Sequence, residues 1–143
     1  MLPVAWRPVL AIALGAVLGA WSRYYGEMGI SYLWGSDTPL ATLVVNLTGC
    51  GAMGFATRVC FAPRVHPEIR LLWLTGFMGS YTTFSGYELD SIHLRAAPLW
   101  GADILYWAGS ILGGWLCLEL GQGLAGRYLD GRRHDPPPPN KQE

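Results

Sequence analysis

The chain contains 143 residues, of which 51% are hydrophobic and only 14% are charged, and its formal net charge is zero. Soluble proteins carry about 25% charged residues, and a nucleic-acid-binding protein needs a basic surface, so the composition disfavours both classes. The 19 glycines are typical of membrane helices, where small residues let backbones approach closely. We therefore expect a small all-α integral membrane protein with no nucleic-acid partner.

Four apolar stretches follow one another along the chain, at residues 9–29, 39–61, 69–87 and 99–126. Each reaches the roughly 20 residues that a helix needs to cross a hydrocarbon core about 30 Å thick. Short connectors that contain proline and other turn-forming residues separate them. The pattern predicts four transmembrane helices in one domain over residues 1–130, followed by a disordered, proline-rich tail over residues 131–143.

Two of the stretches contain glycines spaced four residues apart. Gly15 and Gly19 lie in the first stretch, and Gly109 and Gly113 lie in the fourth. Such pairs form a flat helix face that permits tight contact with a neighbouring helix. We expect both pairs to lie at helix–helix contacts.

The basic residues are distributed unevenly between the two ends of the predicted spans. Arg23 and Arg95 lie on one side, and the other eight lysines and arginines lie on the side that holds both termini. Because basic residues collect on the cytoplasmic side of a membrane, the N- and C-termini are predicted to be cytoplasmic.

One carboxamide occurs at membrane depth, since Asn46 lies near the middle of the second stretch. An unpaired polar group in hydrocarbon costs several kcal/mol, so this side chain needs a partner. Two interpretations stay open: Asn46 forms a hydrogen bond between helices, or it donates to a ligand in a polar pathway.

The centre of the third stretch is rich in residues that disfavour a regular helix. Residues 76–87 include three glycines and four serines or threonines, whose side chains compete for backbone hydrogen bonds. We expect a broken helix, with a flexible glycine-rich helix as the alternative. Carbonyl groups freed by a break can bind a hard cation, and the half-helix ends can meet an anion.

A second polar pattern lies in the fourth stretch. Tyr106, Ser110 and Gly114 recur every four residues and so share one helical face. The hydroxyl groups of Tyr106 and Ser110 on this face either form a track of donors for an anion or make hydrogen bonds between helices.

No pattern typical of an enzyme is present. The three histidines lie in connectors or the tail, without a second histidine or a cysteine at the spacing of metal ligands. The chain has neither a phosphate loop nor a nucleophile elbow. We therefore predict that the protein is not an enzyme.

Three longer motifs occur in register along the chain. They are GAVLGAWSRY at residues 15–24, TLVVNLTG at 42–49 and GFMGSYTTFS at 76–85. In sequence, order and spacing they resemble the GxxxGAxxRY, TLxVNxxG and GFxGGxTTFS motifs of the Fluc (CrcB) family of fluoride channels. The resemblance covers the chain except its tail.

The resemblance implies an antiparallel dimer in a bacterial plasma membrane, formed by two copies or by the chain and an oppositely oriented homologue. It implies export of fluoride from the cytoplasm and a structural, non-transported sodium ion at the dimer centre, bound by the backbone carbonyls of Gly79 and Thr82. The fluoride pathway would be lined by seven residues: Arg23, Asn46, Phe84, Ser85, Tyr87, Tyr106 and Ser110.

Several positions depart from the family pattern. Tyr87 replaces the second pore phenylalanine, Gly86 a threonine and Ser80 a glycine, and Asp90 takes the place of a longer acidic residue. Together with the uneven distribution of basic residues, these departures suggest an alternative: a non-conducting structural subunit that inserts one way and pairs with an oppositely oriented homologue. A small multidrug exporter is disfavoured, because the first stretch has no acidic residue before Glu27.

Overall fold

The structure is a computed structural model that describes residues 6–35, 39–62, 65–96 and 100–133. Every regular element in this part of the chain is a helix, which confirms the predicted all-α class. The elements are α1 (Trp6–Trp34), α2 (Leu40–Cys60), α3 (Pro67–Arg70), the π-helical η1 (Leu71–Met78), α4 (Gly79–Tyr81), α5 (Phe84–Ala96) and α6 (Trp100–Arg133). Because α3, η1 and α4 are contiguous, they form one helix that ends at Tyr81, shortly before α5 begins.

The helices extend beyond the predicted apolar stretches. Helix α1 is longer at both ends than the predicted 9–29, and α6 runs to Arg133 rather than ending near residue 126. Residues 131–133 of the predicted tail are thus helical, and residues 134–143 lie outside the described part of the chain. Helix α5 continues to Ala96, well past the predicted end at residue 87.

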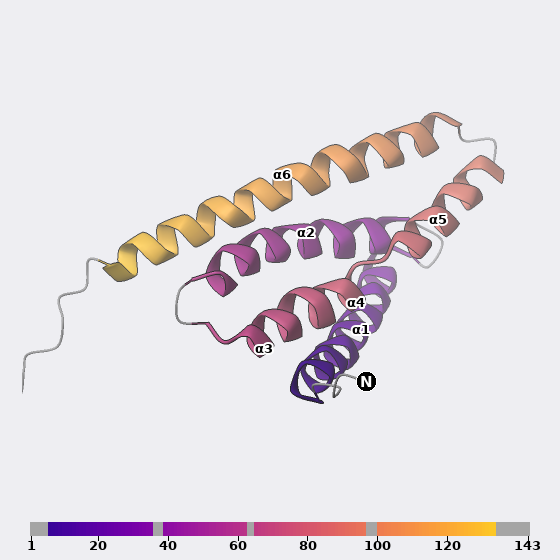
Figure 1. Cartoon of the computed structure of the whole chain (residues 1–143). Coiled ribbons are helices and arrows are strands. Elements are labelled where there is room, and N and C mark those ends of the chain that lie inside the picture. Colours follow the sequence, from indigo (N-terminus) through magenta and orange to yellow (C-terminus); the bar gives the residue numbers. More distant parts are fainter. Residues whose placement is uncertain (1–5, 36–38, 63–64, 97–99, 134–143) are drawn as a thin grey trace, which may run out of the picture.

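The helices pack as two groups, and α2 of the first group also contacts α1 and η1 of the second. Helix α6 runs alongside α2, and α1 packs against η1 and α4. Figure 1 shows α5 leading away from this group toward the beginning of α6. The interruption between α4 and α5 therefore lies near α1 and α2, and both helices can supply side chains to it.

Glycines bring the paired helices into backbone contact. A Cβ atom at Gly15 would overlap the carbonyl oxygen of Leu72, and one at Gly19 would overlap that of Phe77, so the predicted contact of this pair is confirmed. The second predicted pair is only half right. Gly113 packs against Leu47, whereas no other helix in the described part of the chain comes within 4 Å of the Cβ position of Gly109. The tight contact between α2 and α6 involves Gly54 and Gly121 instead.

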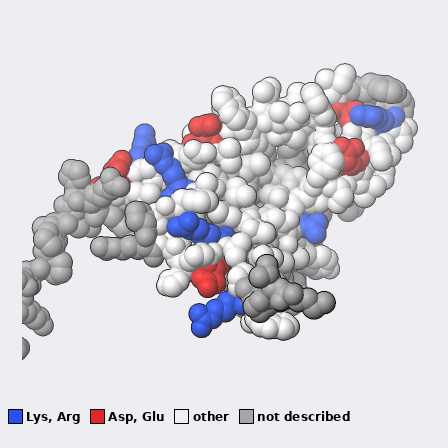
Figure 2. All heavy atoms as spheres, in the orientation of Figure 1, with Lys and Arg blue, Asp and Glu red and all other residues white. Residues whose placement is uncertain are grey.

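Most large apolar side chains of the described residues lie on the surface. Val45 is 1% exposed, whereas Leu14 and Trp21 of α1 and Leu105 of α6 are each at least 60% exposed. Figure 2 shows a largely uncharged surface on one face, with charged side chains mainly toward the ends of the molecule. Such large apolar patches mark surfaces that contact lipid or another protein.

Two of the described helical segments, Leu40–Cys60 and Gly101–Gly131, are long and apolar enough to cross a membrane. Helix α1 has the length, but Arg23 and the two tyrosines that follow it make its second half more polar. The third predicted span is divided at residues 82–83. The first and third predicted spans are therefore helical, but neither is a continuous helix that is both long and apolar enough to cross a membrane by length and composition alone.

Candidate functional site

The interrupted helix is the centre of the candidate site. Thr82 adopts an extended backbone with φ −84° and ψ 152°, which ends the helix that began at Pro67. Its hydroxyl donates to the carbonyl of Met78 at 3.0 Å. Thr83 then caps α5, because its hydroxyl accepts the backbone N–H of Gly86 at 3.1 Å. The predicted break is confirmed, and the two threonines that follow Tyr81 form it.

Asn46 reaches from α2 to the break and binds one residue there twice. Its side-chain oxygen accepts the backbone N–H of Thr83 at 2.8 Å, and its side-chain nitrogen donates to the carbonyl of Thr83 at 2.9 Å. The carboxamide thus replaces the peptide partners that Thr83 would have in a continuous helix. Of the two interpretations of Asn46, the structure shows the hydrogen bond between helices. One N–H of the amide has no partner among the described residues and stays available as a donor.

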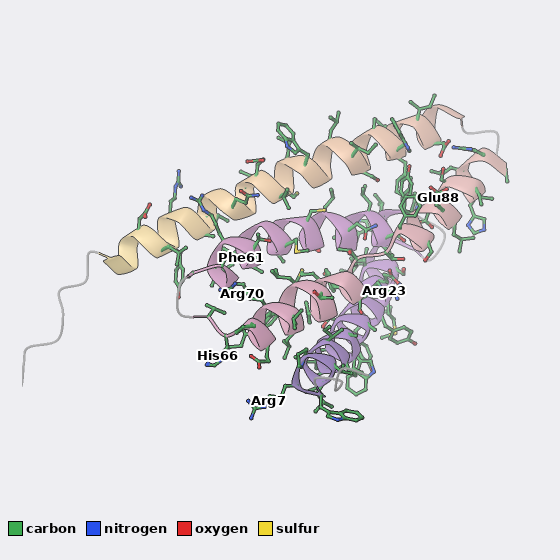
Figure 3. The ribbon with its side chains drawn as sticks, viewed as in Figure 1. Arg7, Arg23, Phe61, His66, Arg70 and Glu88 are labelled. Carbon is green, nitrogen blue, oxygen red and sulfur yellow. The ribbon has the colours of Figure 1, made fainter. Side chains whose placement is uncertain are left out.

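Arg23 approaches the break from α1. Its Nε donates to the carbonyl of Ser80 at 3.3 Å, and its Nη1 lies 3.9 Å from a carboxylate oxygen of Glu27. In Figure 3, Arg23 lies beside the point where α4 ends. The first-span arginine is therefore bound to the interrupted backbone in this structure.

A cavity of about 340 Å³ opens beside the break. Its walls come from α2, the break, α5 and α6, and consist of Asn46, Cys50, Thr82, Thr83, Phe84, Tyr87, Trp107, Ser110 and Ile111. Four of the seven predicted pathway residues, Asn46, Phe84, Tyr87 and Ser110, are among them. The rings of Phe84 and Tyr87 have centroids 5.7 Å apart. The cavity therefore combines an amide donor, a serine hydroxyl and two neighbouring aromatic rings.

The other three predicted pathway residues lie outside this cavity. Tyr106 lies behind Tyr87, with the two rings stacked at a centroid distance of 5.3 Å, and its hydroxyl donates to Asp90 at 3.1 Å. Ser85 is exposed, with its hydroxyl 3.2 Å from that of Thr83. Arg23 is bound at Ser80, as described above.

The predicted hydroxyl track of α6 is partly engaged by the protein itself. The hydroxyl of Ser110 donates to the carbonyl of Tyr106 at 2.7 Å, and the Tyr106 hydroxyl is directed toward Asp90 rather than into the cavity. Ser110 must therefore turn its hydroxyl before it can donate to a ligand.

A buried acidic residue that sequence reasoning missed joins α5 to α6. Asp103 is 5% exposed and accepts hydrogen bonds from the Ser91 hydroxyl and, at 2.7 Å, from Nε of Arg95. The Asp103 hydrogen bond and negative charge raise the pKa of Arg95 above its ordinary value. A lone aspartate in the first turn of an apolar stretch was the available signal, but its partners lie on another helix.

Backbone oxygens are the available ligands for a cation at this site. The described residues contain no group of three His, Cys, Asp or Glu side chains that could hold a metal ion. In a continuous helix, the Gly79 carbonyl would accept from Thr83 and the Thr82 carbonyl from Gly86. Here Asn46 and the Thr83 hydroxyl take these two N–H groups. The carbonyl groups of Gly79 and Thr82 therefore lack their helical partners. Apart from Gly79's chain neighbours and the backbone of its own helix, no atom of the described residues lies within 4 Å of its Cβ position.

A helix interrupted within an apolar stretch is a feature of membrane transport proteins, in which such breaks form binding sites for ions. The chain matches the family described as "CrcB-like protein, Camphor Resistance (CrcB)" over residues 10–122, and it belongs to that family. The family consists of ion channels rather than enzymes, and the chain is accordingly a membrane protein.

Curated relatives cover most of the chain. A protein of Synechococcus sp. named "Fluoride-specific ion channel FluC" is 45% identical over 87% of this chain and 97% of its own length. A Synechocystis sp. protein of the same name is 40% identical over 88% of this chain and 98% of its own length. A Moorella thermoacetica protein named "Fluoride-specific ion channel FluC 1" is 38% identical over 81% of this chain and 84% of its own length. The resemblance noted from the three motifs is therefore confirmed at the level of the family.

Proposed function

We propose that the protein is a fluoride-specific ion channel that exports fluoride from the cytoplasm across a bacterial plasma membrane. The observation that carries this proposal is the cavity beside the helix break, which unites Asn46, Phe84, Tyr87 and Ser110. The names of the family relatives support fluoride as the ion.

The lining suits a small anion that must bind and leave quickly. The free N–H of Asn46 is a donor for fluoride, and the positive edges of the Phe84 and Tyr87 rings can face an anion without trapping it. Ser110 adds a hydroxyl once it turns away from the Tyr106 carbonyl. Conduction requires a succession of such weak sites rather than one strong site. Ser85, Tyr106 and Arg23 would act at the approaches, where the positive charge of Arg23 attracts anions.

A structural, non-transported sodium ion at the centre of a dimer is part of the proposal. Backbone oxygens suit a hard cation, and the Gly79 and Thr82 carbonyls lack their helical partners, so the residues fit such an ion. A bound cation would offset the electrostatic cost of anions nearby. Gly79 is exposed in the single chain, so a second subunit can supply matching carbonyls.

The partner is either a second copy or an oppositely oriented homologue, in an antiparallel dimer surrounded by lipid. The extensive exposed apolar surface supports both contacts. The uneven distribution of basic residues favours one orientation, with both termini in the cytoplasm.

Fluoride efflux from liposomes that contain only this protein and sodium tests the proposal. We expect fast efflux of fluoride and none of chloride. Phe84→Leu should slow efflux roughly tenfold, equivalent to about 1.4 kcal/mol in the barrier. Phe55→Leu is the matched control, because Phe55 lies outside the cavity lining. Equal slowing by both variants, or equal passage of chloride, would contradict the assignment of the cavity as the pathway.

The alternative is a non-conducting structural subunit of a heterodimeric fluoride channel. This alternative is motivated by Tyr87, which stands where the family pattern has a pore phenylalanine and adds a hydroxyl group to the ring. No efflux from folded protein alone, followed by efflux once the oppositely oriented homologue is added, would favour this alternative. Tyr87→Phe is the suitable restoring change. A Cβ atom at Gly86 would lie 2.9 Å from the side chain of Thr83, so Gly86→Thr would disturb the break.

A further inference from the structure

We propose that Asn46 and Thr83 are positioning residues that create the cation site by diverting two backbone N–H groups. The inference rests on the proposed sodium ion and extends it to the side chains responsible for it. Neither side chain needs to touch the cation. Their role is to keep the two ligand carbonyls out of the helical hydrogen-bond pattern.

The hydrogen bonds at the break carry this argument. A helical carbonyl accepts the N–H of the residue four positions later. The Thr83 N–H, the helical partner of the Gly79 carbonyl, bonds instead to Asn46 Oδ1 at 2.8 Å. The Gly86 N–H, the helical partner of the Thr82 carbonyl, bonds instead to the Thr83 hydroxyl at 3.1 Å. The two diverted donors are thus those of the two proposed ligands.

Three other carbonyl groups at the break accept hydrogen bonds from nearby residues. The Ser80 carbonyl accepts from Arg23, and the Thr83 carbonyl accepts from Asn46. The Met78 carbonyl accepts from both the backbone N–H and the hydroxyl of Thr82. Gly79 and Thr82 are left as the carbonyls from which helical donors have been removed by side chains.

A positioning role for Asn46 and Thr83 can be distinguished from a role in helix contact alone by the dependence of thermal stability on sodium. A residue that only joins α2 to the break would alter thermal stability equally with and without sodium. A residue that keeps the ligand carbonyls available would alter the sodium concentration needed for stabilisation, because losing it lets the N–H groups compete with the cation for the carbonyls.

The test measures thermal unfolding of the purified full-length protein in detergent across a series of sodium concentrations, with N-methylglucamine as the replacement cation. We expect sodium to stabilise the unmodified protein. In Asn46→Leu and Thr83→Val the midpoint of this effect should rise about tenfold, as expected for the loss of a hydrogen bond. Thr83→Ser keeps the hydroxyl and should retain the midpoint. Thr57→Val is the matched control, since the Thr57 hydroxyl bonds only within α2, to Met53.

An unchanged sodium midpoint in Thr83→Val and Asn46→Leu, with lower stability at every sodium concentration, would overturn the inference. Asn46→Leu also removes two hydrogen bonds from the fold and can prevent folding. In that case, the sodium midpoint of Thr83→Val compared with that of Thr83→Ser tests the inference. Absence of any sodium effect in the unmodified protein would overturn both the sodium site and this inference. Fluoride efflux from the same preparation would still report separately on the proposed channel.

Discussion

The contact between α2 and α6 provides the sharpest test of the packing, through substitution of Gly121 by alanine. A Cβ atom at Gly121 would overlap the carbonyl oxygen of Gly51 and lie 3.0 Å from the backbone nitrogen of Phe55. Both atoms belong to the backbone of α2, so no side chain can rotate away to make room. Accommodation requires the two helices to separate, and with them the neighbouring contact at Gly54.

The expected magnitude follows from two opposing effects. Overpacking in a tight contact costs about 1–3 kcal/mol, while alanine is favoured over glycine in a helix by about 0.8–1.0 kcal/mol. Because the overlap is with backbone atoms of α2 that cannot rotate away, the overpacking cost should lie in the upper half of its range, about 2–3 kcal/mol. After the gain of about 1 kcal/mol in helix propensity, Gly121→Ala should destabilise the protein by about 1–2 kcal/mol. Gly123 lies on the same helix, but among the described residues no neighbouring helix comes within 4 Å of its Cβ position. Gly123→Ala keeps only the favourable effect and should stabilise the protein by about 0.5–1 kcal/mol.

Thermal unfolding in detergent, followed by circular dichroism, measures the difference between the two variants. For a chain of this size, 1 kcal/mol corresponds to roughly 4 °C in Tm, so Tm should fall in Gly121→Ala and rise in Gly123→Ala. A shift of the same sign and size in both would refute the reasoning, because helix propensity alone would then govern the result.

Three further outcomes are expected. Tyr87→Phe should keep or increase fluoride efflux, because it retains the ring in the cavity wall and removes a hydroxyl with no partner among the described residues; a tenfold loss would show that this hydroxyl takes part in conduction. Asp103→Ala should lower Tm more than Arg95→Met does, because it removes the acceptor for both Ser91 and Arg95. The loss of Tm in Arg95→Met should become smaller in high salt. Equal losses of Tm in the two variants at all salt concentrations would contradict this prediction. A reporter fused to the C-terminus should be found only in the cytoplasm, and equal populations on both sides would contradict a single orientation.

Local composition was sufficient to predict the helices and the existence of the break. The apolar stretches supply the helices because a chain at membrane depth must satisfy its backbone internally. Glycine and hydroxyl residues between Gly76 and Tyr87 weaken the third helix from within the sequence itself. The contacts of Gly15 and Gly19 followed from their four-residue spacing, which places both on one face. The same spacing was not sufficient for Gly109, which makes no such contact.

The position of the break and the partners of the polar residues depend on distant parts of the chain. Thr83 is held by Asn46, 37 residues earlier, and no local pattern specifies which of several threonines receives that carboxamide. The same applies to Asp103, whose partners lie on α5. Tyr106 shares a face with Ser110 as predicted, but its hydroxyl is engaged by Asp90, which periodicity cannot reveal.

The geometry of Asn46 links the two proposed ion sites through one side chain. Its oxygen and one N–H hold Thr83, and the amide also forms part of the cavity wall. In the proposed channel, the donor for fluoride would therefore be fixed in orientation by the same bonds that remove the helical partner of the Gly79 carbonyl. An asparagine that were free to rotate would present either its oxygen or its nitrogen to the cavity, and an oxygen would repel an anion. Because the N–H and carbonyl of Thr83 require opposite ends of the amide, the Asn46 side chain cannot flip while both bonds are kept. In the proposed channel, its remaining N–H would then favour an anion over a cation beside the break.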